Sequence, residues 1–131
     1  SRTVELHGNG TYAHCLECGR RHELDWIAEQ LEAHSGAPAC VECAGIVKTA
    51  TISFGQSMPV EAMRRAGEMT RDSDLFLAVG SSLVVEPAAS FPALAAQLGI
   101  PLVIVNGEPT PADRLAELVI HDDIGDVLEA V

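Results

Sequence analysis

Two closely spaced pairs of cysteines constrain this chain more than any other feature of its sequence. The chain has four cysteines, Cys15, Cys18, Cys40 and Cys43, and each pair has the spacing C-x2-C. A two-residue gap lets one tight turn direct both thiolates at the same ion, and two such turns complete the tetrahedral coordination that Zn²⁺ prefers. The pattern therefore predicts a structural zinc site in which all four cysteines are ligands and no coordination position is open.

Disulfide bonds are the main alternative for these cysteines. They would need an oxidising compartment, and residues 1–4 have neither the basic start nor the apolar core of a signal peptide. A redox-active pair is a weaker alternative, because two equivalent pairs are harder to explain than one. His14, His22 and His34 lie near the cysteines in the sequence. Since four thiolates leave no vacancy for them, we expect these histidines at the surface or beside the ligands.

Length, composition and charge narrow the possible functions. A chain of 131 residues with 47% hydrophobic content is long enough for one domain, or for a small domain with an insertion. Its formal net charge of −11 would repel a phosphate backbone, so we expect no direct nucleic-acid ligand. No apolar run reaches the roughly 18 residues of a membrane-spanning helix, so we expect no membrane partner. We expect a cytoplasmic protein whose acidic surface mainly maintains solubility.

The composition and hydrophobic pattern of the chain change after the second cysteine pair. Residues 8–47 are polar and rich in turn residues, which predicts a small zinc-ribbon lobe. Short β-branched runs then alternate with helix-like stretches, as expected of parallel strands that are buried on both faces. Strands are predicted at 51–54, 75–79, 102–105 and 118–120, and helices at 22–33, after Pro59 and at 88–98. This spacing favours an α/β fold with right-handed crossovers.

Several polar residues stand where the predicted strands end. Val4–Leu6 has the character of a strand without a preceding partner, and His7 follows it before a glycine turn. Histidine can take up a proton near neutral pH and so suits a general base, although a strand-end histidine is more commonly structural. In the same way, Ser81 or Ser82 could be a helix N-cap, and Asn106 could belong to an ordinary turn. These residues alone do not choose between the roles.

The order of five motifs distinguishes between these roles. They are Glu5-Leu6-His7-Gly8, the two cysteine pairs, Ser53-Phe54-Gly55-Gln56, Gly80-Ser81-Ser82-Leu83 and Val105-Asn106. In this order and at this spacing, the chain resembles the sirtuins, which are NAD-dependent protein-lysine deacylases, along essentially all of its length. The resemblance implies part of a Rossmann-like parallel sheet with an inserted zinc lobe. Residues 1–7 would then end a strand at the catalytic histidine, 8–47 would be the zinc lobe, and 48–131 would be the second half of the NAD-binding domain.

The resemblance also implies a role for each motif. His7 matches the catalytic base of a reaction in which nicotinamide leaves NAD and the acyl group of lysine passes to ADP-ribose. Contacts to NAD are implied for Gly80, Ser81, Ser82, Asn106, Asp123 and Ile124. The segment beside the acyl-lysine channel matches Ile52, Ser53, Phe54 and Gly55, where a substrate peptide with an acetylated or acylated lysine would pair as an extra strand. NAD as co-substrate and structural Zn²⁺ are the implied cofactors.

Other motifs of the family are not found in this chain. The family's glycine-rich phosphate loop, Asp-Phe-Arg segment and Gln-Asn-Ile-Asp motif precede its catalytic histidine. We therefore expect the chain alone to be inactive, and its bare sheet edge to favour self-association or pairing with the missing N-terminal half. Ala44, Thr49 and Gln56 depart from the usual glycine, proline and glutamate. The alternatives are an ADP-ribosyltransferase or longer-chain deacylase of the same family, or a zinc-ribbon interaction module without catalysis.

Overall fold

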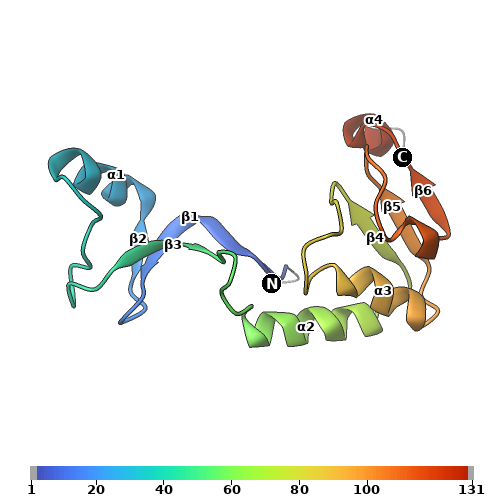
Figure 1. The fold of residues 1–131 in the computed structure, drawn as a ribbon, viewed down its shortest axis with the longest axis horizontal. Coiled ribbons are helices and arrows are strands. Elements are labelled where there is room, and N and C mark those ends of the chain that lie inside the picture. The colour runs from blue at the N-terminus through green and yellow to red at the C-terminus, as the bar shows by residue number, and fades with distance from the viewer. Residues whose placement is uncertain (1–2, 130–131) are drawn as a thin grey trace. The chain divides into compact units, whose positions relative to one another are not determined.

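The computed structural model describes residues 3–129, and these form two compact units (Figure 1). The first unit is Glu5–Met58, which contains every cysteine and is called the cysteine unit below. The second is made of residues 59–129 with residues 3–4 and is called the sheet unit. Residues 48–58, which the sequence assigns to the NAD-binding part, therefore make their contacts within the cysteine unit.

The cysteine unit is built on a three-stranded antiparallel sheet in the order β2-β1-β3. Its strands are β1 (Gly8–Cys15), β2 (Arg21–Glu23) and β3 (Val47–Thr51), and the helix α1 (Leu24–Ala33) follows β2 directly. The core consists of four small side chains, with Ile27 of α1 packed against them; these are Ala13, Cys15, Cys40 and Val47. So little apolar area gives this unit little stability of its own.

Three predictions for this part of the chain are wrong in detail. The helix expected from His22 begins at Leu24, because residues 21–23 pair with β1. Of the strand expected at 51–54, only Thr51 is in a strand; that strand is β3, and it pairs antiparallel with β1 instead of joining a parallel sheet. Residues 4–6 form no strand, since a strand needs a hydrogen-bonded neighbour and none of the described strands lies beside them.

The sheet unit confirms the predicted α/β fold with a parallel sheet. Its strands, in the order β4-β5-β6, are β4 (Phe76–Val79), β5 (Leu102–Val105) and β6 (Leu118–Ile120). Its helices are α2 (Val60–Arg71), α3 (Ser90–Gln97), the 3₁₀ turn η1 (Asp113–Leu115) and α4 (Ile124–Glu129). The core gathers on one face of the sheet around Ala78, Leu102, Ile104 and Ala112. Within residues 3–129, every helix is too short or too polar to cross a bilayer.

The other face of this sheet is only partly covered by the described residues. Leu77 pairs through Val103 with Leu118, so all three side chains point to the same face. Leu77 is 48% exposed and Leu118 is 51% exposed. The sequence predicts strands that are buried on both faces, and the structure shows this for one face. The described chain therefore presents an apolar sheet surface and, at β4, a strand with a neighbour on one side.

Gly67 lies where α2 packs against α3. It is buried, and a Cβ added to it would lie 3.9 Å from Cε1 of Phe91 and 3.1 Å from Nη1 of Arg71. The first distance is an ordinary van der Waals contact, and the second atom ends a flexible side chain. Sterics therefore do not require glycine at this position of the helix.

We expect Gly67→Ala to raise the free energy of unfolding of the sheet unit by about 1 kcal/mol, because glycine costs about that much relative to alanine inside a helix. Hydrogen exchange of the β5 amides measures this, since the chain's single tryptophan, Trp26, lies in the other unit. Gly99→Ala is the control: Gly99 has φ +74°, so alanine there should destabilise. Destabilisation by Gly67→Ala would show that the two helices need glycine to approach.

Candidate functional site

The structure brings the four predicted zinc ligands together. Their Sγ atoms all lie within 4.8 Å of one another, with 3.4 Å between Cys15 and Cys43 and 3.7 Å between Cys18 and Cys40. Tetrahedral Zn²⁺ with bonds of about 2.3 Å to sulfur places its ligands about 3.8 Å apart. A disulfide needs sulfurs about 2.0 Å apart, and all four thiols are free. The donor set fits a metal ion, and none of the three neighbouring histidines belongs to this cluster.

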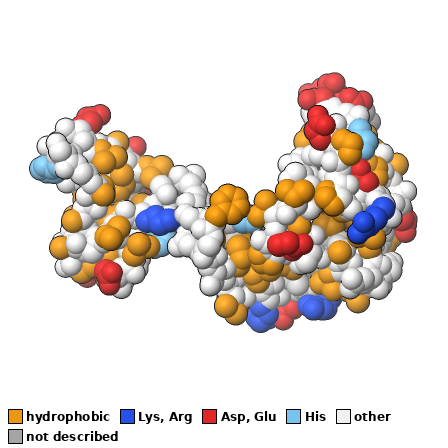
Figure 2. Space-filling view, viewed as in Figure 1, with side chains coloured by type: hydrophobic (Ala, Val, Ile, Leu, Met, Phe, Trp, Pro, Cys, Tyr) orange, Lys and Arg blue, Asp and Glu red, His pale blue; other side chains and the backbone are white. Residues whose placement is uncertain are grey.

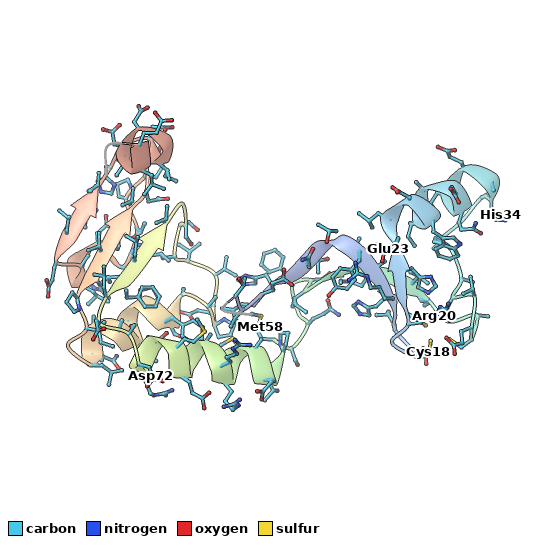
Figure 3. The ribbon with its side chains drawn as sticks, turned by 180° about the vertical axis from the view of Figure 1, so that it is seen from behind. Cys18, Arg20, Glu23, His34, Met58 and Asp72 are labelled. Atoms are coloured by element: carbon cyan, nitrogen blue, oxygen red, sulfur yellow. The ribbon has the colours of Figure 1, made fainter. Side chains whose placement is uncertain are left out.

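The two cysteine pairs lie in matching turns. In each turn, the amide after the second cysteine donates to the carbonyl of the first: Gly19 to Cys15 at 3.0 Å and Ala44 to Cys40 at 2.9 Å. Gly19 has φ +75° and Ala44 has φ +58°, so both residues adopt the left-handed conformation that favours glycine. Cys18 lies in the turn between β1 and β2, beside Arg20 (Figure 3). The same backbone shape thus aims both thiol pairs.

The electrostatics of the cluster favour a cation. Hydrogen bonding by the Cys18 amide, opposed by burial, lowers the pKa of the Cys15 thiol to about 7. For Cys43, the Gly45 amide favours the thiolate, but the sulfurs of Cys15 and Cys18 oppose it and raise the pKa to about 12. One thiol therefore ionises readily while another resists, as expected for like charges in one place. A divalent metal removes this conflict, and its binding releases protons.

Gly8 fixes the backbone beside His7. It has φ +76°, and a Cβ on it would lie 2.0 Å from the carbonyl oxygen of Ala50. Only glycine allows β1 to start this close to β3, and the Ile52 amide then donates to the His7 carbonyl at 2.9 Å. The structure thus joins the predicted catalytic residue to the first predicted substrate-binding residue. His7 precedes β1 and is exposed, rather than ending a strand as expected.

The remaining substrate-binding positions form a turn. The Gln56 amide donates to the Ser53 carbonyl at 3.0 Å, and Oε1 of Gln56 accepts from the Ser53 amide at 2.7 Å. Gly55 has φ +85°, and Phe54 is 96% exposed. The glutamine that departs from the family pattern therefore closes this turn through its side chain. Peptide binding along the segment stays a prediction.

Three strands end together at the carboxyl edge of the parallel sheet. The Gly80 amide donates to the Val105 carbonyl, and the Asn106 amide donates to the Ile120 carbonyl, each at 3.0 Å. Gly80 has φ +62°, and a Cβ on it would lie 2.9 Å from Cδ1 of Ile124. Predicted cofactor-binding residues from three parts of the sequence therefore meet at one edge. This is the edge where open parallel sheets bind nucleotides.

The two serines that follow Gly80 are not helix caps. The hydroxyl of Ser81 accepts from the Leu83 amide at 3.4 Å, and α3 begins only at Ser90, with Ala89 at its N-cap position. The N-cap interpretation is therefore wrong. The chain between β4 and α3 is a loop, which leaves Ser81 and Ser82 exposed at the sheet edge. Their contact with a cofactor stays a prediction.

Sequence reasoning missed the residues that hold Asn106. Its Nδ2 donates to the Glu108 carbonyl at 2.7 Å, and its own carbonyl faces Nδ1 of His121 at 2.9 Å. Nε2 of His121 lies 3.3 Å from Oδ2 of Asp113. Asp113 also accepts from the hydroxyl of Thr110, which together with the Thr110 amide and His121 holds the pKa of Asp113 below its usual value. The Thr110-x2-Asp113 spacing is a signal that could have indicated a capped turn, whereas no sequence pattern links His121 to Asn106.

Asp123 has a structural contact of its own. Its Oδ1 accepts from the amides of Gly125 at 2.8 Å and Asp126 at 3.2 Å, so it caps the start of α4. Acidic side chains gather over this helix (Figure 2). Negative charge at a helix N-terminus is stabilising. The predicted cofactor contact at Asp123 stays a prediction.

Comparison with known proteins identifies relatives of this chain. The model of the Sir2 family matches residues 1–87. The NAD-dependent protein deacetylase of Rhodopseudomonas palustris is 60% identical over 125 residues, which cover 95% of this chain and 49% of that protein. NAD-dependent protein deacetylase 2 of Streptomyces coelicolor is 39% identical over 130 residues, which cover 99% of this chain and 54% of that protein. The chain thus spans about half the length of the curated relatives it matches.

Solved structures agree with these matches. A complex described as Sir2-p53 peptide-NAD+ is 33% identical, with a TM-score of 0.92, and covers 98% of this chain and 53% of its own chain. Sir2Tm bound to a propionylated peptide also has a TM-score of 0.92 and 33% identity, and covers 98% of this chain and 54% of its own. The backbone described above is therefore closely similar to that of the matching half of these proteins.

We expect purified protein to contain about one zinc ion per chain and to lose the fold of the cysteine unit when a chelator removes it, since structural zinc contributes on the order of 10 kcal/mol to small domains. Metal analysis and amide NMR spectra measure both effects, with the sheet-unit resonances as internal control. Apparent zinc affinity should rise between about pH 6 and about pH 8, because protons compete for the thiolates. A metal-free chain with an intact cysteine unit would contradict the assignment.

We expect opposite effects from exchanging the residues that close the two cysteine turns. Left-handed backbone costs alanine about 1–2 kcal/mol, offset by about 0.4–1 kcal/mol because alanine lowers the entropy of the unfolded chain. Ala44→Gly should therefore stabilise the zinc-loaded unit by about 0.5–1 kcal/mol, and Gly19→Ala should destabilise it by a similar amount. No atom lies within 4 Å of a Cβ at Gly19, so only conformation is tested there. Trp26 fluorescence during denaturation measures both, and equal signs would refute the argument.

Proposed function

This chain belongs to the Sir2 family, and on that premise we propose that it forms half of an NAD-dependent protein-lysine deacetylase. The observation that most supports the proposal is the meeting of Gly80, Asn106 and Ile124 at the carboxyl edge of the sheet. The relatives that match this chain in sequence are named NAD-dependent protein deacetylases. The co-substrate NAD would supply ADP-ribose as the acceptor of the acyl group.

His7 would act as the general base. It is exposed, and the hydrogen bond from Ile52 to its carbonyl holds its backbone in place. A neutral imidazole can take a proton from a ribose hydroxyl, which makes that oxygen a nucleophile toward the acyl carbon. Gly8 lets the backbone after His7 lie against Ala50 of β3, so the cysteine unit fixes the backbone that carries the His7 ring.

The carboxyl edge would bind the adenosine half of NAD. The side chain of Asn106 is held through Nδ2 by the Glu108 carbonyl, which leaves its Oδ1 as an acceptor for a ribose hydroxyl. His121 holds the carbonyl of the same residue. Gly80 has no side chain, so the end of β4 lies close against Ile124 at the edge where a nucleotide would bind. The loop hydroxyls of Ser81 and Ser82 would add contacts to phosphate or ribose oxygens.

The acylated lysine of a protein would be the second substrate. Ile52, Ser53, Phe54 and Gly55 follow β3, and the exposed Phe54 ring offers apolar area next to a peptide backbone. We also propose a cytoplasmic location, because a reducing compartment keeps the four cysteines as thiols that can bind zinc. The partly covered sheet face and the one-sided strand β4 would bind the other half of the enzyme.

The proposal is tested with a chimera in which this chain replaces the matching half of the Rhodopseudomonas palustris deacetylase. We expect the chimera to remove acetyl groups from an acetyl-lysine peptide in the presence of NAD, and the isolated chain to be inactive. In the chimera, His7→Ala should lower kcat by at least about 100-fold, as loss of a general base does. Mass spectrometry of peptide and nicotinamide measures both products.

His34→Ala is the matched control, because His34 lies at the end of α1 on the surface of the cysteine unit (Figure 3). It should leave kcat unchanged. Activity that survives His7→Ala would remove the histidine from the mechanism. A folded chimera that contains zinc but does not consume NAD would favour a non-catalytic zinc-ribbon module.

A further inference from the structure

A buried histidine lies against the four-cysteine cluster. His22 is in β2 and is 6% exposed, which is unusual for a side chain that can carry a charge. Its ring stacks on Trp26 of α1, with centroids 4.6 Å apart and an angle of 28° between the planes. In the β1–β2 ladder His22 is paired with the buried Ala13, so both side chains point to the core side of the sheet. Cys15 follows two residues after Ala13 on the same side.

One nitrogen of this ring is unsatisfied within the protein. Nε2 of His22 is buried and has no hydrogen-bond partner among the described residues. A buried donor without an acceptor costs about 1–3 kcal/mol, so native structures rarely keep one without a reason. The ring is also fixed by its stack on Trp26 and cannot turn toward solvent without losing that contact.

The sulfur of Cys40 is an acceptor near the ring, because Cys40 packs in the same core cluster as Ala13, the strand partner of His22. Cys40 is 4% exposed and belongs to the same core cluster as Cys15. Burial opposes ionisation of Cys40, but the amides of Glu42 and Cys43 and the neighbouring His22 ring favour its thiolate, and together they lower its pKa. A neutral thiol is a weak acceptor, whereas a thiolate is a strong one. A hydrogen bond from His22 to this sulfur would therefore be stronger when Cys40 is a thiolate.

We propose that His22 is a positioning residue of the zinc site, which donates a ring N–H to the metal-bound thiolate of Cys40. Four thiolates around one divalent ion leave an excess of negative charge, and N–H donors spread that charge. The Glu17 amide, 3.4 Å from the sulfur of Cys15, does the same in the other turn. His22 thereby links α1 and β2 to the metal centre through Trp26. The inference depends on the zinc site and is independent of the NAD chemistry.

The test compares zinc affinity in variants of the full chain. His22→Phe keeps a flat ring to stack on Trp26 and removes the donor. Loss of a hydrogen-bond partner of a metal ligand typically lowers metal affinity by about 10–100-fold, and we expect a loss in this range from competition with a chromogenic chelator. His22→Gln, whose amide can donate, should recover part of the loss. His34→Phe, on the exposed end of α1, should match the wild type.

A second measurement needs no variant and so does not depend on the folding of His22→Phe. In wild-type chain loaded with ¹¹³Cd in place of zinc, the ring N–H of His22 should show a scalar coupling to the metal across the hydrogen bond and the sulfur. Absence of this coupling, or zinc affinity in a folded His22→Phe equal to that of the wild type, would overturn the proposal. A directly bonded imidazole nitrogen, seen as nitrogen–cadmium coupling, would make His22 a ligand and overturn it as well.

Discussion

The fold of the cysteine unit depends on the approach of four sulfur atoms to within 4.8 Å of one another. Two matching turns bring them there, and the small core around Ala13 and Val47 supplies little apolar area to keep them there. Crowded thiols resist ionisation, as the raised pKa of Cys43 shows, so the unit needs a cation to join its two turns. The cysteines thus take the place that a hydrophobic core has in a larger domain.

The sheet unit is organised by a different constraint. Hydrogen bonds at the ends of β4, β5 and β6 align Gly80, Asn106 and His121 along one edge, and the core lies on one face. Asn106 is then held on several sides, by backbone, by its own side chain and by the His121–Asp113 pair. Such an edge has a defined shape before any ligand arrives, which lowers the entropy that binding must overcome.

Glycine has a specific task at two of the candidate site positions. At Gly8 the carbonyl of Ala50 occupies the place of a side chain, and at Gly80 the side chain of Ile124 does so. In both cases the backbone is left-handed, and a neighbouring segment approaches more closely than a Cβ allows. Ala44 shows the opposite case, because it adopts the same left-handed conformation with a side chain present. These positions connect local backbone preference directly to the geometry of the sites.

The sequence by itself determined the four cysteines as candidate zinc ligands, the parallel strands β4 to β6 and the order of motifs that places the chain in its family. Cysteine spacing and β-branched runs are local signals that need few distant contacts to be interpreted. Only the tertiary structure decided that residues 47–51 pair with β1, that residues 4–6 form no strand, and that His22 is buried opposite Ala13. It also showed that His121, paired with Asp113, contacts the carbonyl of Asn106. The physical reason is that strand partners and buried polar contacts join residues far apart in the chain, and a periodic pattern does not specify which distant residue will be the neighbour.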